Sequence, residues 1–337
     1  MKQSIMFKNK PLIKSWASVA GKKESEGPLG SYFDVTTDDD MYSGKNWEQA
    51  ESRMQTEAVK KAISKSGIST NDIGGIVAGD LLGQLMATSF GISQLQFPFL
   101  GVYGACSTMG ESIAVASMIV SAGFSDNVIA MTSSHFATAE KQFRFPLGYG
   151  NQRPLSATTT VTGSGAVVIS SKGEESDETP IYIEGVTIGK IEDYGVKDAN
   201  NMGAAMAPAA YSVIMANLKE NEMLASDYDC VITGDLGVVG GRILNDMLLH
   251  EGVDITERYM DCGVEIYNLD SQDAHSGGSG CGCSAITLCG YILGRLKSGQ
   301  WKKVLFVPTG ALLSTVSLHE GNTIPAIAHA IILKGGK

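Results

Sequence analysis

The chain has 337 residues, enough to bury one large core or two smaller ones without support from disulfides or metals. Hydrophobic residues make up 43% and charged residues 18%, and 40 glycines stand against 9 prolines, which excludes a disordered or collagen-like chain. The formal net charge of −10 repels phosphate backbones, so we expect no nucleic-acid partner.

The N-terminal residues and the cysteines both indicate a reducing compartment. Residues 1–10 include three lysines and no apolar run typical of a signal peptide, so we expect a cytoplasmic protein. The most apolar stretch, 113–124, is interrupted by two serines and is too short to span a bilayer. We therefore expect reduced thiols at all six cysteines, which are Cys106, Cys230, Cys262, Cys281, Cys283 and Cys289.

Helices and strands are predicted to alternate along the first half of the chain. An amphipathic helix is expected over 47–66, and Gly67 is expected to end it. Short apolar runs typical of buried strands follow at 73–78, 97–102 and 128–132, and a helical stretch, 107–122, lies between the last two. This alternation predicts an α/β fold.

Two segments of the chain are repeated at long range. Residues 72–81 match residues 227–236, with Asp, Gly, Asp and Leu identical, at an offset of 155 residues from 72 to 227. Residues 121–130 resemble residues 297–306 at an offset of 176, which places about 21 additional residues in the second half. Self-similarity at such a long period indicates a duplicated unit.

The repeat predicts two pseudo-symmetric α/β halves. The first half is expected to span residues 1–172 and the second 178–337, joined by a polar stretch of linker composition. Each half should contribute one central helix, over 107–122 and 284–296. We expect these two helices to pack side by side in the core.

Cys106 lies in the sharpest local feature, a small-residue turn between a predicted strand and a predicted helix. The strand is expected to end at Tyr103 and the helix to begin at Ser107. A thiol at a helix N-terminus has the helix dipole and free N–H groups nearby, which favour a thiolate or a bound anion. The alternative is that Cys106 is a small buried hydrophobic residue.

The chain resembles the stage V sporulation protein AD family of the thiolase-like superfamily. The superfamily likeness rests on the duplicated halves and on an Ala-Cys-Ser elbow before the central helix of the first half. The family likeness covers nearly the whole chain, and its motifs are GPLG at 27–30, AGDLL at 78–82, FPFL at 97–100, GACST at 104–108, TSSH at 132–135, QFR at 142–144, MGAAMAPAA at 202–210, TGDL at 233–236, DCG at 261–263 and GGSGC at 277–281.

This resemblance implies a thiolase-like fold with mixed sheets and central buried helices. It implies binding of dipicolinic acid (pyridine-2,6-dicarboxylate), either free or as its Ca²⁺ chelate, and assistance in its uptake into developing spores. It also implies membrane-embedded partners from the same sporulation operon, a homodimer, and a place in the forespore cytoplasm at the spore inner membrane.

Whether such a protein is an enzyme depends on the partners of its cysteine. Condensing enzymes of the superfamily need a His–Asn or His–His pair to accept protons and to hold the thioester oxyanion. The corresponding sites here read Thr-Gly-Asp at 233–235 and Gly-Cys-Gly at 280–282, so both partners are missing. We therefore predict a non-catalytic binding protein. The alternative is an active ketoacyl-synthase-like or thiolase-like acyltransferase that uses Cys106, with His135 or His329 as a replacement partner.

A dicarboxylate needs donors, which the helix N-terminal amides, Arg144 and His135 supply. Asp80 and Asp235 have the wrong charge for an anionic ligand, and three explanations are open. They could accept hydrogen bonds from the backbone or from water, one of them could be protonated by burial, or they could hold a Ca²⁺ that arrives with the ligand. Alternatively, both are turn carboxylates satisfied by local N–H groups. Because Asp80 is at a strand end and outside the strand-packing core, its replacement by Arg or Lys is expected to abolish ligand binding and to leave the fold intact. The candidate ligand-binding residues are Asp80, Cys106, Ser107, Thr108, His135, Arg144, Asp235, Cys281 and His329.

No resident metal or cofactor is expected. Cys281 and Cys283, with Cys262 and Cys289, do not have the Cys-x-x-Cys spacing of a metal site, and we interpret them as packed thiols with Cys281 near the pocket. Arg153 is interpreted as a surface or structural arginine. The segment 202–210 is expected to enter a helix with Pro208 in its first turn and to cover the site.

Overall fold

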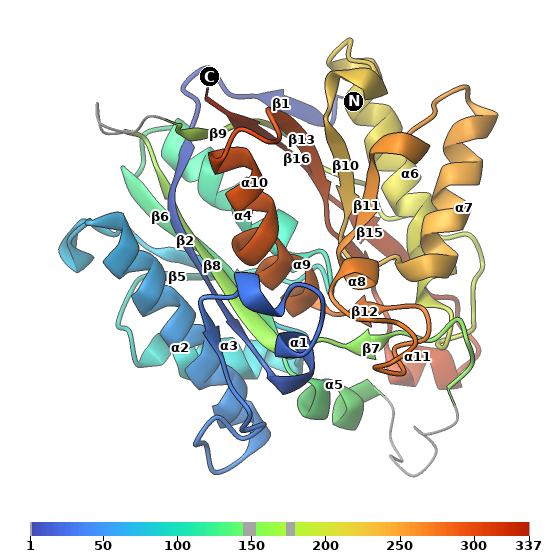
Figure 1. The fold of residues 1–337 in the computed structure, drawn as a ribbon, viewed down its shortest axis with the longest axis horizontal. Helices are drawn as coiled ribbons and strands as arrows, with labels where there is room; N and C mark the ends of the chain where they lie inside the picture. Colours follow the sequence, from blue (N-terminus) through green and yellow to red (C-terminus); the bar gives the residue numbers. More distant parts are fainter. Residues whose placement is uncertain (1, 144–152, 173–178, 337) are drawn as a thin grey trace.

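The computed structural model describes residues 2–143, 153–172 and 179–336, and one long twisted sheet runs through them (Figure 1). Two short strands lie outside the main strand order: β1 (Ser4–Met6) pairs with β9, and β3 (Val35–Thr36) pairs with β2. From one edge to the other its strands are β11 (Tyr259–Asp261), β10 (Cys230–Thr233), β13 (Lys303–Val307), β16 (Ala330–Gly335), β9 (Ile181–Thr187), β2 (Leu12–Ala20), β8 (Gly163–Ser170), β6 (Asn127–Ser134), β4 (Ile76–Gly79) and β5 (Phe99–Gly101).

The two groups of strands repeat one topology. In chain order the first group is β2, β4, β5, β6 and β8, and the second is β9, β10, β11, β13 and β16. Counted along the chain, the strands of each group lie in the order third, second, fourth, fifth, first from the outer edge of the sheet to its centre. The third, second and fourth strands are parallel to one another, and the fifth is antiparallel to both the fourth and the first. The first strands, β2 and β9, pair with each other at the centre. This confirms the duplicated α/β fold predicted from the repeat, with β4 and β10 as equivalent strands.

Helices lie outside and between the two groups of strands (Figure 1). Apolar side chains of α2 (Trp47–Ser66) and α3 (Met86–Ser93) cover the outer face of the first group. Those of α6 (Met202–Glu220) and α7 (Gly237–His250) cover the outer face of the second. Each sheet face is therefore buried, which explains why the strands read as continuous apolar runs.

The central layer consists of two helices in contact with each other. One is α4 (Thr108–Ser121), and the other runs without a break through α9 (Cys281–Thr287), the π-helical turn η7 (Leu288–Ile292) and α10 (Leu293–Lys297). Their side chains share one hydrophobic cluster with strands of both halves. This confirms the prediction of two central helices packed side by side.

Local signals explain the ends of α2. The Asn46 side chain accepts from the Gln49 N–H at 2.9 Å, which satisfies a donor that has no partner inside the helix. Gly67 follows with φ of +70°, a left-handed conformation that favours glycine. The observed helix, Trp47–Ser66, therefore has the predicted bounds.

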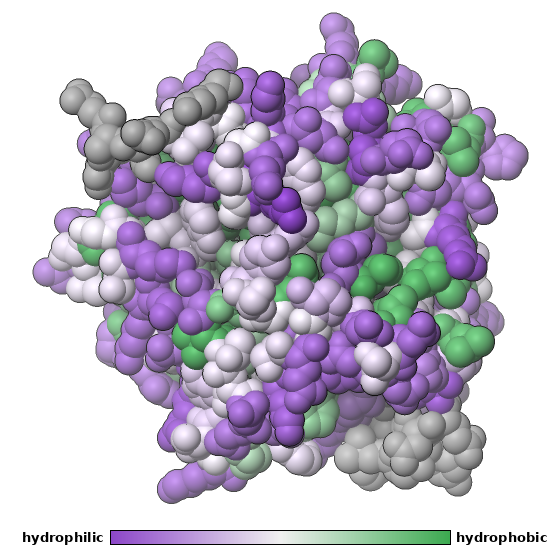
Figure 2. All heavy atoms as spheres, viewed as in Figure 1, coloured by the Kyte–Doolittle hydropathy of each residue, from purple (hydrophilic) through white to green (hydrophobic). Residues whose placement is uncertain are grey.

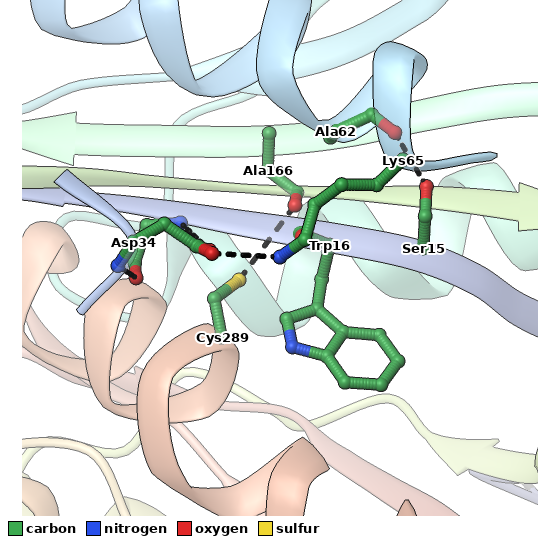
Figure 3. Close-up of polar contacts among 8 residues, drawn as sticks. Ser15, Trp16, Asp34, Ala62, Lys65, Ala166 and Cys289 are labelled. Atoms are coloured by element: carbon green, nitrogen blue, oxygen red, sulfur yellow. Dashed lines mark hydrogen bonds and ion pairs between the residues drawn. The ribbon is translucent and has the colours of Figure 1, made fainter. Parts of the chain in front are cut away.

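Polar contacts join β2 and its neighbour β8 to helices on the two faces of the sheet (Figure 3). On one face the Ser15 hydroxyl donates to the Ala62 carbonyl of α2 at 2.6 Å, and Lys65 of the same helix donates to the Trp16 carbonyl at 2.8 Å. On the other face the Cys289 thiol of η7 lies 3.7 Å from the Ala166 carbonyl of β8, the strand beside β2. The sheet is thus joined here to an outer helix on one face and to a central helix on the other.

Short elements bring the two halves together below the central layer. They are α1 (Lys22–Ser25), α5 (Phe136–Phe143), α8 (Cys262–Glu265), α11 (Thr315–His319) and the strand pairs β7 (Thr159–Thr160) with β12 (Gly278–Ser279) and β14 (Thr309–Ala311) with β15 (Ala326–Ala328). The face of the molecule seen in Figure 2, viewed as in Figure 1, is mostly hydrophilic, and hydrophobic residues gather near the lower end of α7. The β7–β12 pair joins a segment of the first half to a segment of the second.

Two details of the predicted elements were wrong. The run 97–102 was expected to be a buried strand, but β5 is an edge strand whose Phe99 and Leu100 are 37% and 53% exposed, because it has a neighbour on one side only. Pro208 was expected in the first turn of a helix, yet α6 begins at Met202 and Pro208 lies inside it. There the Asn201 side chain, not the proline, marks the helix start by accepting from the Ala204 N–H.

Candidate functional site

A tight turn between β5 and α4 holds Cys106. The strand ends at Gly101, earlier than predicted, and Ala105 has φ of +50°, which is unusual for a residue with a side chain. The Ser107 hydroxyl donates to the Gly104 carbonyl at 2.7 Å, and the Thr108 hydroxyl donates to the Ala105 carbonyl at 2.5 Å. The backbone N–H groups of Ser107 and Thr108, which were predicted to contact the ligand, also donate within the turn, to the same two carbonyls at 3.0 and 3.2 Å.

Cys106 lines a small cavity of about 80 Å³ between the two halves. Its walls are largely apolar, with a few polar groups among them, as is usual for small-ligand sites. The lining residues are Leu81, Tyr103, Ala105, Cys106, Ala139, Glu140, Phe143, Thr160, Ala199, Asn200, Met202, Ser279, Ala311 and Leu313. Met202, at the start of α6, lies where the sequence predicted a segment covering the site.

A chain of polar contacts joins Cys106 to a buried carboxyl group. The Cys106 sulfur lies 3.9 Å from the Ser279 hydroxyl, which donates to Asp235 at 3.0 Å. Asp235 also accepts from the Gly280 N–H at 2.9 Å and from the Thr309 hydroxyl at 3.0 Å. Burial, and then the nearby Asp235 carboxylate, raise the pKa of the Cys106 thiol well above its usual range. Cys106 is consequently a neutral thiol at physiological pH.

Asp80 occupies the position equivalent to Asp235 in the first half, but its partners are local. It accepts from the Leu82 N–H at 2.7 Å and from the N–H and hydroxyl of Thr88 at 2.7 and 2.5 Å. The side chain is completely buried and does not line the cavity. Asp80 therefore holds its own turn, as in the alternative of a turn carboxylate satisfied by local donors, and the effect of substituting it stays a prediction.

Neither candidate histidine forms a hydrogen bond with Cys106 in the described part of the chain. His135 has partners at both ring nitrogens, the Asp40 carbonyl at 2.8 Å from Nε2 and the Ala137 N–H at 3.2 Å from Nδ1. His329 accepts from the Gly189 N–H at 3.3 Å, and burial lowers its pKa to about 4. Both rings stand in protein contacts away from the cavity lining.

The remaining thiols are buried and free. Cys281 donates to the Ser133 carbonyl at 2.9 Å, and it shares a small hydrophobic cluster with Cys106 and Leu81, so it lies near the cavity without lining it. All six cysteines are free, as expected. Within the residues that the structure describes, no cluster of three or more His, Cys, Asp or Glu side chains could hold a metal ion. Arg144 lies outside the described residues.

The comparison with known sequences decides the family. The profile of the stage V sporulation protein AD family matches residues 1–334. Stage V sporulation protein AD of Bacillus subtilis (strain 168) is 44% identical over 335 residues, which cover 99% of this chain and 97% of that protein. The chain belongs to the stage V sporulation protein AD family. Membership of this family supports a role in sporulation.

Solved structures confirm the thiolase-like fold. OleA from Xanthomonas campestris has a TM-score of 0.63 at 14% identity, covering 98% of this chain and 100% of that one. The 3-oxoacyl-[acyl-carrier-protein] synthase III of Aquifex aeolicus VF5 has a TM-score of 0.58 at 14% identity, covering 96% and 99%. At this identity the likeness concerns the fold alone. No helix in the described residues is long and apolar enough to cross a membrane.

Sequence reasoning missed Ser279, the residue that links Cys106 to Asp235. The signal that could have found it is its place in the GGSGC motif at 277–281, which supports the family likeness but does not indicate a contact with Cys106. Ser279 reaches Cys106 because β12 pairs with β7, with Ser279 opposite Thr160. Tyr103, Phe143 and Leu313 were also missed, because apolar and aromatic cavity walls carry no distinctive motif.

Proposed function

We propose that this member of the family binds dipicolinic acid in the cavity beside Cys106, without turnover, and so assists its uptake into developing spores. The observation that carries the proposal is the Cys106–Ser279–Asp235 contact chain at the cavity wall. It replaces the basic partner of a nucleophilic cysteine with a carboxyl group. A cavity on a thiolase-like scaffold is thereby suited to binding rather than to acyl transfer.

The combination of apolar walls and a few polar side chains supports a flat aromatic ligand with polar ends. Leu81, Phe143 and Leu313 offer apolar surface for a ring, and the side chains of Tyr103 and Asn200 offer donors, whereas the Ser279 hydroxyl already donates to Asp235. Burial raises the pKa of Asp235, so a carboxylate ligand nearby favours the protonated form further. A Ca²⁺ ion carried by the ligand would also reduce the repulsion between Asp235 and the carboxylates of the ligand.

Calorimetric titration with dipicolinate, with and without Ca²⁺, tests the proposal. We expect saturable binding, and we expect pyridine-2-carboxylate to bind at least about tenfold more weakly, because it lacks the second charge-assisted contact. Equal affinity for the two compounds would show that the second carboxylate is not recognised. Absence of binding under both conditions would remove dipicolinate as the ligand.

A second candidate function is acyl transfer, which the fold of the structural neighbours and the position of Cys106 on its turn favour. A thiol whose pKa is raised by burial is a poor nucleophile, and missing proton acceptors or oxyanion donors each commonly cost about 10²-fold or more in rate. We therefore expect no turnover of acetyl-CoA. A stoichiometric burst of CoA that disappears in Cys106→Ala would support the enzyme instead.

We also propose that the protein acts as a homodimer. We propose further that it works in the forespore cytoplasm at the inner membrane, together with membrane-embedded proteins of the same operon. The β5 edge supports the dimer, since Phe99, Leu100 and Tyr103 are exposed beside unpaired backbone groups. Sedimentation of the wild type and of Leu100→Lys tests this. A monomeric wild type would contradict it.

A further inference from the structure

One wall of the Cys106 cavity is the short helix α5, which contributes Ala139, Glu140 and Phe143 to the lining. The helix has eight residues, and its buried side chains are those of Ala137, Thr138 and Ala139. So short a helix with so few buried side chains has little stability of its own, and its position depends on bonds to neighbouring elements. Those bonds therefore influence the shape of the cavity.

Two side-chain attachments outside the cavity lining hold α5 in place. Near the end of the helix, the Gln142 side chain accepts from the Gly83 N–H at 3.1 Å and donates to the Leu81 carbonyl at 3.3 Å. Near its start, the Thr138 hydroxyl lies 2.9 Å from a carboxyl oxygen of Glu51 on α2. Glu51 is 1% exposed and does not line the cavity. The second attachment therefore contains a titratable group, whereas the first does not.

The contacts of Glu51 are complete only when its carboxyl group carries a proton. The Thr138 hydroxyl lies 2.9 Å from Glu51 Oε2 and 3.0 Å from the His135 carbonyl oxygen, and it has a single hydrogen to donate. A protonated Glu51 donates to Thr138, which then donates to His135. An ionised Glu51 can only accept, so one of these two hydrogen bonds is lost. The other carboxyl oxygen accepts from the Ser133 hydroxyl at 2.8 Å in either state.

The surroundings of Glu51 disfavour its ionised form. In the described part of the chain, no lysine, arginine or histidine forms an ion pair with it. The titratable and charged groups on the elements around it are Glu48 in the preceding turn of α2, Asp80 at the end of β4, Cys281 of α9, Lys14 of β2, His135 directly before α5, and Glu140 and Lys141 of α5, whereas β6, β8 and α3 carry none. Burial, and then the proximity of Asp80, raise the pKa of Glu51 to about 8. An ionised Glu51 is therefore a buried charge without a counterion, which favours movement of α5 and entry of water.

We propose that Glu51 is a positioning residue for the Cys106 cavity, which in its protonated form holds α5 against α2 and on losing the proton releases this wall. The consequence for the ligand rests on the proposed function, whereas the attachment of α5 does not. The protonated side chain keeps Ala139 and Phe143 in the lining without touching the ligand itself. Affinity for an aromatic dicarboxylate consequently declines in alkaline solution, although the carboxylates of the ligand stay ionised throughout that range.

Hydrogen exchange of peptides that cover α5 tests the attachment without any ligand. We expect the protection factor to fall about tenfold between pH 7 and pH 9 in the wild type, because each pH unit above the folded pKa favours the open state about tenfold. It should stay nearly constant in Glu51→Gln, whose amide donates to Thr138 and accepts from Ser133 at every pH. Glu57→Gln, on the exposed side of α2, is the matched control and should behave as the wild type. Constant α5 protection in the wild type, or an equal fall in peptides of α7, would overturn the attachment.

Calorimetric titration with dipicolinate at the same two pH values tests the consequence for the site. We expect the Kd of the wild type to rise severalfold from pH 7 to pH 9 and that of Glu51→Gln to stay level, because the fraction of molecules with the wall in place falls only in the wild type. Gln142→Ala, which removes the attachment without a titratable group, should raise the Kd at both pH values. A wild-type Kd that is constant, or that changes equally in Glu51→Gln, would overturn the role of Glu51 in the site. If dipicolinate does not bind at all, the proposed function fails, while the hydrogen-exchange experiment still judges the attachment of α5.

Discussion

Ser279 donates a hydrogen bond to Asp235 at 3.0 Å while its oxygen lies 3.9 Å from the Cys106 sulfur. One serine thereby connects the thiol of the first half to a carboxyl group of the second. The thiol remains protonated in this environment, because burial and the adjacent carboxylate both raise its pKa. The contact accounts for a cysteine at a helix start that is not activated.

Replacing Asp235 with asparagine should make Cys106 more acidic. The variant removes a negative charge near the sulfur, so the pKa of the thiol falls, although burial still keeps it above its usual range. Alkylation of the Cys106 peptide by iodoacetamide, followed by mass spectrometry across pH, measures the change. Asp246→Asn, on the exposed surface of α7, is the control. An unchanged alkylation profile in Asp235→Asn would show that the two groups are not coupled.

Cys106→Ala should weaken dipicolinate binding only modestly. The turn and the cavity walls remain, and one small contact is lost, on the order of 1 kcal/mol or about a fivefold higher Kd. Calorimetry on the folded variant provides the measurement. A hundredfold loss would instead make the thiol a principal ligand contact.

Stability should fall as pH rises from about 4.5 to about 8, because of Glu51. This buried residue accepts from the Ser133 and Thr138 hydroxyls at 2.8 and 2.9 Å, and burial raises its pKa to about 8. A carboxyl group whose pKa is higher in the folded state favours folding below its unfolded pKa, and that contribution is lost as the pH passes the folded value.

Urea unfolding of the wild type and of Glu51→Gln between pH 4.5 and 8 tests this. We expect a smaller pH dependence in Glu51→Gln, and Glu57→Gln, on the exposed side of the same helix, serves as the control. A Glu51→Gln variant with the wild-type pH profile would mean that another group titrates in this range.

Gly310→Ala should destabilise the protein and disturb Cys106. An added Cβ would lie 2.0 Å from the Gly104 carbonyl oxygen and 3.2 Å from the Cys106 nitrogen, so the turn must shift. Thermal unfolding and dipicolinate affinity report the two effects. Gly294→Ala is the control, because its Cβ meets no atom within 4 Å and alanine favours a helix by about 0.5–1 kcal/mol. Equal stability of the two variants would contradict the contact.

Much of the fold follows from signals that lie close together in the chain. The bounds of α2 depend on Asn46 and Gly67, immediately before and after it, and the cysteine turn depends on small residues next to a helix start. The long repeat carried topology as well, because two similar sequences fold into the same strand order. These features were predictable because each arises from neighbouring residues or from a direct comparison of two segments.

The tertiary structure decided which candidates share a site. Asp80 and Asp235 stand in matching sequences, yet Asp80 binds its own turn, while Asp235 receives donors from β12 and β14 and reaches Cys106 through Ser279. Burial of strand 76–79 and exposure of strand 99–101 likewise depend on which strands lie beside them. Sequence determines what a residue can donate, accept or bury. Only the pairing of distant strands determines which partner it meets, because that choice is a property of the whole packed chain.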